Sequence, residues 1–328
     1  MLMEASRKNL LKMNKKIANN GINDFNLKSY LKEQQEIINN KLRKVLSLYD
    51  IKRGLIAAME YSLMANGKRL RPILCIAAAQ CIGTNNQKSK EKAMLPACAI
   101  EMIHTYSLIH DDLPAMDDDD FRRGNPTLHK KFSEATAILA GDALLTHAFS
   151  ILSNPLQHTF KPLSSDALVK IISIISDAAG TNGMVEGQVL DMAASLTIES
   201  IEPFEYIKHM HALKTGELII ASVKTGGVAA GADPDQLKQL VVYARNIGMA
   251  FQIIDDILDI EGDSAVMGKQ AGSDEANKKL TFPQVIGLKA SKEYAKKLVS
   301  DALKSLESFE EKALPLEKIA QYIIERKY

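Results

Sequence analysis

The amino-acid sequence predicts an all-α protein built as a single large helical bundle. Apolar residues make up 46% of the 328 residues, Trp is absent, and there are only 18 Gly and 10 Pro, a composition typical of a mostly helical chain. Apolar side chains recur with the helical period along most of the chain, whereas no stretch shows the sustained alternation of a strand. Short breaks at Gly, Pro or Asn separate these segments, which favours helices packed into one bundle.

The first 24 residues are expected to be a partly ordered extension. They are basic, with Arg7, Lys8 and Lys12 among their cations, and they end in the turn-like segment Asn19–Asp24. A basic, weakly amphipathic segment of this kind would also fit an organelle-targeting sequence. One α-helical domain is expected over residues 25–328.

The first regular helix is expected from Phe25, where apolar residues begin a stripe that runs to Leu46. A second helix fits Leu55–Ala65 and ends at Gly67, where a glycine suits a left-handed cap. A break at Gly180–Gly183 precedes the segment Met184–Asp191. Further helices are expected at Pro72–Cys81, Ala93–Asp112, Phe132–Ser153, Ser165–Ala179, Phe204–Gly226, Asp235–Ile260, Tyr294–Lys312 and Leu316–Arg326.

Charge and cysteine content argue against several classes of protein. The formal net charge is +1, whereas a general nucleic-acid-binding surface would need a basic excess, so no nucleic-acid partner is expected. Cys75, Cys81 and Cys98 are an odd set without a C-x-x-C pair, which argues against a disulfide framework or a zinc site and favours a reducing compartment. No apolar run reaches the ~18 residues of a membrane span and no signal core is evident, so a cytoplasmic protein without a membrane span is expected.

The segment Asp111–Gly124 concentrates negative charge, because six carboxylates within ten residues run straight into Arg122 and Arg123. Two carboxylates about 6 Å apart repel by roughly 3 kcal/mol at an effective dielectric of 20, so such a cluster needs full solvation or a cation. The acids follow an apolar helical run rather than a polar loop, and a similar pattern recurs at Phe251–Asp259. Both observations favour the cation.

The spacing of the carboxylates suits Mg²⁺. Asp255 and Asp259 are four residues apart, which on a helix puts them within about 40° and about 6 Å of one another, and Gln252 precedes them on nearly the same face. Asp111 and Asp117 are six apart, which is awkward on a regular helix, but a turn distorted by the intervening proline could bring both to one ion. Mg²⁺ takes one or two carboxylates, keeps waters and completes its shell with phosphate oxygens.

Other metal and phosphate sites do not match the sequence. An EF-hand loop would need Gly at its sixth position and Glu at its twelfth, and neither is present. His209 and His211 are only two apart, so on a helix they diverge, and they are expected to be surface or packing residues. The sequence contains neither a P-loop motif nor a glycine-rich nucleotide-binding fingerprint after a strand. A phosphate ligand would therefore be held in another way.

A cationic segment lies upstream, at Lys68-Arg69-Leu70-Arg71-Pro72. It places three cations directly after a glycine that ends a helix and before a proline that can open the next one. Such a segment would fit a compact anion site, and it would equally fit a basic surface turn. These residues alone leave both interpretations open.

Taken together, these motifs resemble those of the trans-prenyltransferases, and among them the bacterial farnesyl diphosphate synthases. The chain carries D-D-x-x-x-x-D at 111–117, D-D-x-x-D at 255–259, G-K-R-x-R-P at 67–72 and F-R-R-G at 121–124, and the similarity covers roughly residues 25–328. The resemblance implies an all-α bundle around a deep central cavity, usually a homodimer, with the two aspartate motifs facing each other at the mouth.

The resemblance also implies a reaction and its residues. Isopentenyl diphosphate would condense with dimethylallyl or geranyl diphosphate, with the departing pyrophosphate stabilised by Mg²⁺ and protein cations and then accepting the last proton. About three Mg²⁺ ions, with Mn²⁺ as a possible substitute, would bind to Asp111, Asp117, Asp255 and Asp259, assisted by Asp112 and Asp256. The allylic diphosphate would contact Arg122, Lys214, Thr215, Gln252 and Lys269. The pocket for isopentenyl diphosphate would be formed by Gly67, Lys68, Arg71, His104 and Arg123.

Product length is expected to depend on Tyr106. This residue lies five positions before Asp111, about 7.5 Å below it along a helix axis, with Ser107 one step nearer. In the family an aromatic residue here floors the cavity, which implies a C15 product, (2E,6E)-farnesyl diphosphate. An ordinary core tyrosine would also fit this position.

Two segments are expected to move. The polar segment Asp263–Leu280 has the composition of a mobile loop, and we expect it to close over the diphosphate through Lys269. The terminal residues Glu325–Tyr328 would either cover the second pocket or form a frayed helix end.

Three other functions would share part of this pattern. A geranylgeranyl or longer-chain polyprenyl diphosphate synthase shares the motifs, and Tyr106 is the residue that argues against it. A terpene cyclase would normally mix Asn, Ser and Glu at its second metal site, where this chain has only aspartate. A non-catalytic subunit would be expected to have lost some of the matched residues, and all of them are present.

Overall fold

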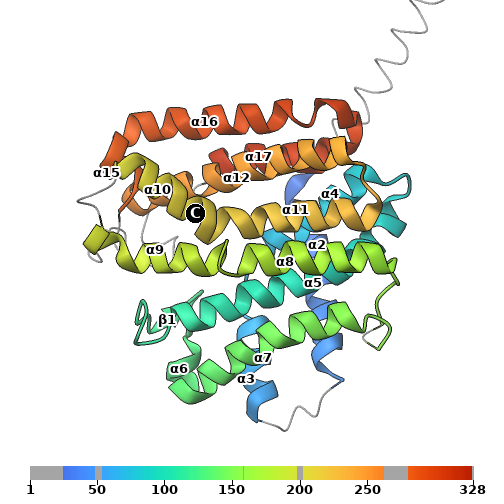
Figure 1. Ribbon diagram of the computed structural model, residues 1–328, viewed down its shortest axis with the longest axis horizontal. Helices are drawn as coiled ribbons and strands as arrows, with labels where there is room; N and C mark the ends of the chain where they lie inside the picture. The colour runs from blue at the N-terminus through green and yellow to red at the C-terminus, as the bar shows by residue number, and fades with distance from the viewer. Residues whose placement is uncertain (1–24, 49–53, 158, 198–201, 262–279, 327–328) are drawn as a thin grey trace, which may run out of the picture.

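The computed structural model describes residues 25–48, 54–157, 159–197, 202–261 and 280–326. These residues are almost entirely helical, which confirms the predicted all-α class (Figure 1). The helices are α2 (Leu27–Leu46), α3 (Gly54–Leu63), α4 (Leu70–Ile82), α5 (Asn86–Asp111), α6 (Leu128–Lys131), α7 (Glu134–Ser153), α8 (Ser165–Ala179), α9 (Met184–Thr197), α10 (Pro203–His211), the π-helix η1 (Ala212–Gly216), α11 (Glu217–Ala230), α12 (Pro234–Glu261), α15 (Phe282–Ile286), α16 (Leu288–Lys304), the 3₁₀-helix η2 (Glu307–Ala313) and α17 (Leu314–Glu325).

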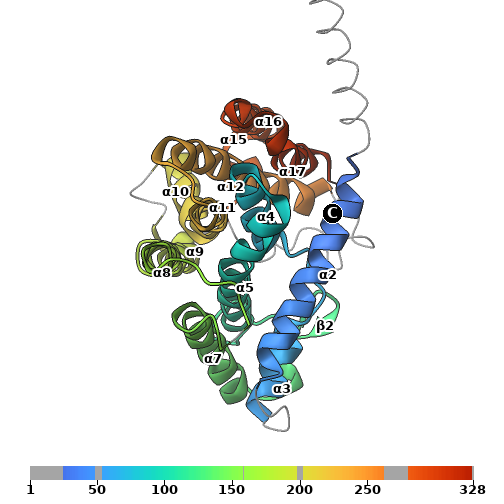
Figure 2. The same ribbon diagram turned by 90° about the vertical axis from the view of Figure 1, so that its right-hand side faces the viewer.

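Helix α11 lies at the centre of the bundle. It packs against α4, α5, α8 and α12, and most of α4 and α11 is buried. The helices α4 and α11 approach closely at Gly226, where an added Cβ would lie 2.0 Å from the carbonyl oxygen of Cys75. In Figure 2, long helices such as α8 and α16 are seen end-on, whereas α2 runs across the view.

Local sequence signals account for the helix boundaries. Asn26, Asn85, Ser133 and Ser164 cap α2, α5, α7 and α8 through side-chain oxygens that accept a backbone N–H three residues later. Helix α11 ends at Gly231 in the left-handed conformation, with φ 86°. These caps satisfy terminal groups that would otherwise have no partner inside the helix.

Several predicted boundaries were wrong. Gly67 is not a left-handed cap, because α3 already ends at Leu63 and the left-handed residue is Arg69, with φ 52°. The helix expected over Phe204–Gly226 is interrupted by the π-helix η1 and extends to Ala230. The helix expected over Tyr294–Lys312 consists of α16, which ends at Lys304, and the separate 3₁₀-helix η2.

One β-hairpin was not predicted. It pairs β1 (Phe121–Arg122) with β2 (Asn125–Pro126) in antiparallel register. Arg123 and Gly124 form its turn with φ of 55° and 78°, the conformation that two-residue hairpins require. Strands of two residues are too short to give an alternating apolar pattern.

Among the described residues, two stretches are long and apolar enough to cross a membrane by length and composition alone, so the expected absence of a membrane span stays a prediction. They are α7 and the run Ser165–Ala193. In the most apolar 18 residues of each, 44% of α7 and 33% of the second run is buried inside the protein. A buried helix in the core of a water-soluble protein meets the same criterion. The three cysteines are buried free thiols, as expected for a chain without a disulfide framework.

Candidate active site

The first acidic segment forms a closed turn at the C-terminal end of α5. The helix ends at Asp111, and the backbone N–H of Asp117 donates to the carbonyl oxygen of Asp111 at 2.9 Å. Asp118 adopts φ 49°, which aspartate tolerates better than most residues, and its N–H donates to Leu113 at 3.1 Å. The turn therefore brings the backbone of Asp117 back to that of Asp111. This is the distorted turn that the sequence predicted.

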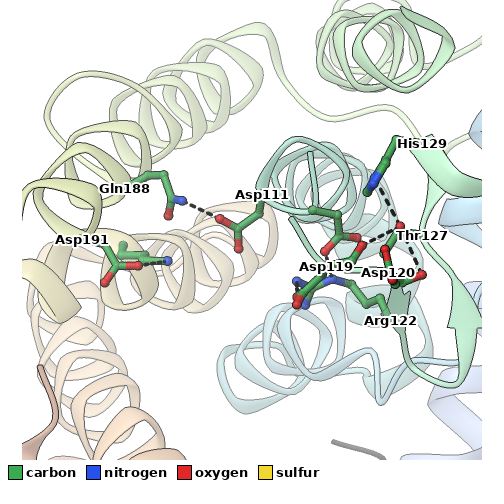
Figure 3. A network of polar contacts seen from close by, with 10 residues as sticks. Asp111, Asp119, Asp120, Arg122, Thr127, His129, Gln188 and Asp191 are labelled. Atoms are coloured by element: carbon green, nitrogen blue, oxygen red, sulfur yellow. Dashed lines mark hydrogen bonds and ion pairs between the residues drawn. The ribbon is translucent and has the colours of Figure 1, made fainter. Parts of the chain in front are cut away.

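Arg122 is held by two carboxylates of the same segment. Its Nε donates to Asp112 at 2.5 Å and its Nη2 to Asp119 at 3.2 Å. Asp112 is only 4% exposed, and burial raises its pKa to about 6 although the Arg122 guanidinium opposes this. Asp112 thus has a protein cation as its partner, and its assistance to a metal stays a prediction. Figure 3 shows Arg122 beside Asp119.

The remaining acids of the segment stabilise the chain around the hairpin. Asp120 forms an ion pair with Lys130 at 2.7 Å. The Thr127 hydroxyl donates to the carbonyl oxygen of Asp119 at 2.7 Å (Figure 3). The hairpin turn directs Arg123 toward Gly67, where an added Cβ would lie 2.4 Å from Nη1 of Arg123. Glycine at position 67 therefore leaves room for the guanidinium in this position, and its backbone conformation does not itself require glycine.

A cavity of about 500 Å³ brings the cationic segment and the second acidic segment together. Lys68 and Arg71 border it, and so does Asp255. All five residues predicted for the isopentenyl diphosphate pocket line its wall: Gly67, Lys68, Arg71, His104 and Arg123. From the predicted allylic diphosphate contacts, Arg122, Thr215 and Gln252 line it as well.

This cationic cavity is suited to an anion. Burial lowers the pKa of Arg71 to about 10, so that the guanidinium stays charged at neutral pH, and its Nε finds no hydrogen-bond partner among the described residues. Arg71 Nη1 lies 3.3 Å from His104 Nε2. Burial, followed by the charge of Arg71, lowers the pKa of His104 well below its ordinary value, so the imidazole is neutral and accepts from Arg71. A diphosphate would supply the missing negative charge.

Arg69, the third cation of the segment, faces the protein core. It forms a buried ion pair with Glu101 at 2.6 Å and donates to the carbonyl oxygen of Leu63 at 2.6 Å. Its Nε donates to Asn39 at 2.9 Å. Arg69 therefore anchors the connection between α3 and α4. It borders the cavity together with Lys68 and Arg71, but its guanidinium is already engaged by Glu101 and Leu63.

The second acidic segment lies on the uninterrupted helix α12. Asp255 pairs with Arg326 at 2.6 Å, and Arg326 also stacks on the Phe251 ring at 4.0 Å. Asp256 is buried and accepts the Phe282 backbone N–H at 2.9 Å, so its carboxylate stabilises the start of α15. Lys327 and Tyr328 lie outside the described residues.

The π-helix η1 supplies the next pair of polar residues. Thr215 donates to Gln252 at 3.1 Å, and Gln252 in turn donates to Asp256 at 3.2 Å. Lys214 forms an ion pair with Asp191 of α9 at 2.5 Å. Such π-helical insertions are frequent at functional sites because they turn side chains away from the regular helix face. Lys269, the fifth predicted contact of the allylic diphosphate, lies outside the described residues.

Two polar residues of α9 were missed by the sequence analysis. Gln188 donates through Nε2 to Asp111 Oδ1, and Asp191 holds Lys214 (Figure 3). Their spacing of three residues on a largely apolar helix was the available signal, since it places both on one face. In the sequence, Met184–Asp191 was noted only as the segment after the helix break at Gly180–Gly183, with no role in the site.

A second cavity, of about 780 Å³, extends from the acidic turn into the bundle. Arg71, His104 and Thr215 line both this cavity and the cationic one, so the two adjoin. Most of its wall is apolar, and the predicted floor residues Tyr106 and Ser107 both contribute to it. Burial leaves Tyr106 only 7% exposed.

The carboxylates fit Mg²⁺. Asp111 and Asp117 share one turn, and Asp255 and Asp259 share one face of α12, so each segment supplies two hard oxygen donors. Of these four, Asp111 lines the apolar cavity and Asp255 lines the cationic one. Within the described ranges no three His, Cys, Asp or Glu residues gather into a complete protein ligand set.

Comparison with known proteins identifies similar chains over nearly the whole length. Residues 52–322 match the model of the family described as polyprenyl synthetase. A dimethylallyltranstransferase from Fischerella ambigua (strain UTEX 1903) is 45% identical over 92% of this chain and 84% of its own length. A geranylgeranyl diphosphate synthase from Cyanophora paradoxa is 42% identical over 92% of this chain and 97% of its own. The crystal structure of an FPP/GFPP synthase from Zymomonas mobilis superposes with a TM-score of 0.78 at 36% identity, covering 91% of this chain and 99% of that one.

Proposed function

This chain belongs to the polyprenyl synthetase family and is a trans-prenyltransferase that condenses isopentenyl diphosphate with an allylic diphosphate, and we propose that its main product is the C15 compound (2E,6E)-farnesyl diphosphate. The single observation that carries the chain length is the position of Tyr106. Its buried ring forms part of the wall of the apolar cavity that starts at Asp111.

The two adjoining cavities divide the substrates between them. The cationic cavity takes the diphosphate of isopentenyl diphosphate on Lys68, Arg71 and Arg123, with His104 orienting Arg71. The apolar cavity takes the growing hydrocarbon chain, because burying apolar surface there is favourable and its wall offers few polar groups.

The protein side chains prepare the leaving group. Arg122, Lys214, Thr215 and Gln252 hold the allylic diphosphate, and Arg122 and Lys214 are already fixed in place by Asp112 and Asp191. Fixed cations at this position stabilise the charge that develops as the bond between C1 and oxygen breaks. The isopentenyl double bond then forms a bond to C1, and the released pyrophosphate takes the proton that restores a double bond.

Asp111, Asp117, Asp255 and Asp259 would hold Mg²⁺, which supplies further positive charge at the diphosphate when bound. In the present structure Gln188 contacts Asp111 and Arg326 contacts Asp255. These two contacts are expected to loosen when metal and diphosphate enter together.

The protein is proposed to act as a homodimer in the cytoplasm. Exposed apolar side chains on α7 and α8 support this arrangement, since Leu139 is 58% and Val169 is 66% exposed. Burying such residues against a second copy would remove apolar surface from water.

A condensation assay tests the proposal. The purified protein is incubated with isopentenyl diphosphate and either dimethylallyl or geranyl diphosphate, with and without Mg²⁺, and the product chain length is measured. Mg²⁺-dependent formation of a C15 product is expected. A predominant C20 or longer product would contradict the chain length, and no condensation in any mixture would contradict the activity itself.

A further inference from the structure

His110 lies directly above Tyr106 on the same face of α5. The two residues are four positions apart, and their rings meet edge to face, with centroids 5.7 Å apart and planes at 79°. Both side chains line the apolar cavity. The imidazole therefore occupies the space next to the tyrosine ring on the side toward Asp111.

Helix α7 fixes the other side of the imidazole. His110 Nε2 lies 3.1 Å from the carbonyl oxygen of Ile138, so this nitrogen carries the proton and donates. A Cβ at Gly141 would lie only 2.2 Å from the same nitrogen, so the ring occupies the space that a side chain at position 141 would need. Asp142 is the nearest charged group on α7, with Oδ1 3.9 Å from Nε2, and it is largely exposed.

These contacts connect Tyr106 to α7 through His110. A tyrosine ring that is packed on one side by a fixed imidazole has less room to turn than one that faces empty cavity. Ile138, which accepts the hydrogen bond, also lines the cavity. The floor is therefore a unit formed by two helices and not a single aromatic residue.

We propose that His110, seated against Gly141, is a positioning residue that holds Tyr106 in place and thereby limits the length of the prenyl product. This inference rests on the proposed function, because it assumes that the growing chain occupies the apolar cavity. His110 acts through the tyrosine ring, so its effect should be on product length and not on binding of isopentenyl diphosphate.

Two substitutions test this without changing a residue assigned to either diphosphate. His110→Ala removes the imidazole, and Gly141→Ala displaces it while leaving His110 in the chain. Both variants should raise the ratio of C20 to C15 product about tenfold, the discrimination typical of a small change in an apolar pocket. The KM for isopentenyl diphosphate should stay within about twofold of the wild-type value, because neither residue lines the cationic cavity.

A conservative variant separates positioning from a general loss of structure. His110→Phe keeps an aromatic ring beside Tyr106 and should retain the C15 product, whereas His110→Ala should not. Circular dichroism and thermal unfolding establish that each variant is folded. If His110→Ala does not fold, Gly141→Ala and His110→Phe still decide the outcome.

The possible results have distinct meanings. A wild-type protein that makes C15 product, together with unchanged product ratios in the folded alanine variants, would overturn the role of His110 and leave the proposed function intact. A raised KM for isopentenyl diphosphate with unchanged product length would also overturn it, since that pattern indicates a general disturbance of the site. A wild-type protein without condensation activity would overturn both.

Discussion

Arg122 and Arg123 are adjacent in the chain but have different surroundings. Arg122 is held by Asp112 and Asp119, whereas Arg123 extends from the hairpin turn to pack on Gly67. The turn conformation produces this divergence, because positive φ at position 123 turns the chain back on itself. At the scale of single residues, then, the hairpin separates two cations that the sequence places together.

Substituting Gly67 tests the packing of Arg123. Gly67→Ala would put a methyl group 2.4 Å from Nη1 of Arg123 and force the guanidinium to move. Losing one contact from a charged donor corresponds to about a tenfold rise in the KM for isopentenyl diphosphate. Steady-state kinetics at saturating allylic substrate measure it.

The matched control is Gly54→Ala, because an added Cβ there meets no atom within 4 Å. This variant should keep the wild-type KM. An unchanged KM in Gly67→Ala would mean that Arg123 does not contact isopentenyl diphosphate from this position.

His104 should make stability depend on pH. Its pKa is lowered in the folded protein, so on acidification through about pH 6.5 the unfolded chain takes up a proton that the folded protein does not. The free energy of unfolding should therefore fall between pH 6.5 and 5, by up to about 1.4 kcal/mol per pH unit from this residue. His104→Gln should reduce that slope, because glutamine can still accept from Arg71 but does not titrate.

Urea unfolding at several pH values measures the slope. His211, whose pKa burial lowers to about 3, adds a similar share that remains in the variant. Between pH 7 and 8 the two proteins should give parallel curves. Equal slopes below pH 6.5 would show that His104 is protonated in the folded protein.

At the scale of elements, close helix contacts position the site. Helix α9 packs against η1 so tightly that a Cβ at Gly187 would lie 2.1 Å from the backbone nitrogen of Lys214. This contact places Asp191 and Lys214 within ion-pair distance. On the other side of the bundle, the approach of α4 to α11 at Gly226 supports the start of α4, where Arg71 lies.

Gly226→Ala should destabilise the bundle. The added Cβ would lie 2.0 Å from the carbonyl oxygen of Cys75, and this backbone atom cannot move alone. Overpacking of this kind costs about 1–3 kcal/mol, which exceeds the gain of about 1 kcal/mol from replacing a helical glycine by alanine. The midpoint of urea unfolding should therefore fall.

The neighbouring Gly227→Ala is the matched control. Its nearest contacts are the side-chain ends of Leu237 at 2.9 Å and Leu240 at 3.0 Å, which can shift. The loss should be clearly smaller than for Gly226→Ala. Equal stabilities of the two variants would contradict the importance of the α4–α11 approach.

At the scale of the whole molecule, apolar surface is unevenly distributed. The helices α4 and α11 are mostly buried, whereas α7 is strongly apolar but only partly covered. Helix α7 also carries Ile138 and Gly141, which lie against the imidazole of His110 beside Tyr106. Contacts made by its outer face would therefore lie close to the part of the site that we propose limits product length.

Disrupting the outer faces of α7 and α8 tests the proposed homodimer. Leu139→Glu combined with Val169→Glu places two charges in a surface that would be buried between copies, and dissociation is expected because an unpaired buried charge is costly. Light scattering after size-exclusion chromatography should give half of the wild-type mass.

Leu156→Glu provides the control, since Leu156 is 70% exposed but lies outside both helices. This variant should keep the wild-type mass. A wild-type protein that is already monomeric, or a double variant that remains dimeric, would contradict this interface.

The fold class could be predicted from the sequence alone, and short motifs marked the candidate site residues. Helical periods and capping residues are local properties, so most helices were predicted to within a few residues. The spacing of Asp255 and Asp259 on one helix also follows from a short segment. The cationic segment at Lys68–Arg71 fitted an anion site and a surface turn equally, and only the structure shows that Lys68 and Arg71 border a cavity. The roles assigned to these residues toward metal and diphosphate stay predictions.

Only the tertiary structure decided the contacts between distant segments. Gln188 meets Asp111 across 77 residues, and Arg326 meets Asp255 from the C-terminal helix. The inward direction of Arg69 and the seat of His110 on Gly141 likewise depend on how close two helices come. The physical reason is that periodicity fixes which face of a helix is buried, whereas side-chain volumes and buried charges fix which helix that face meets.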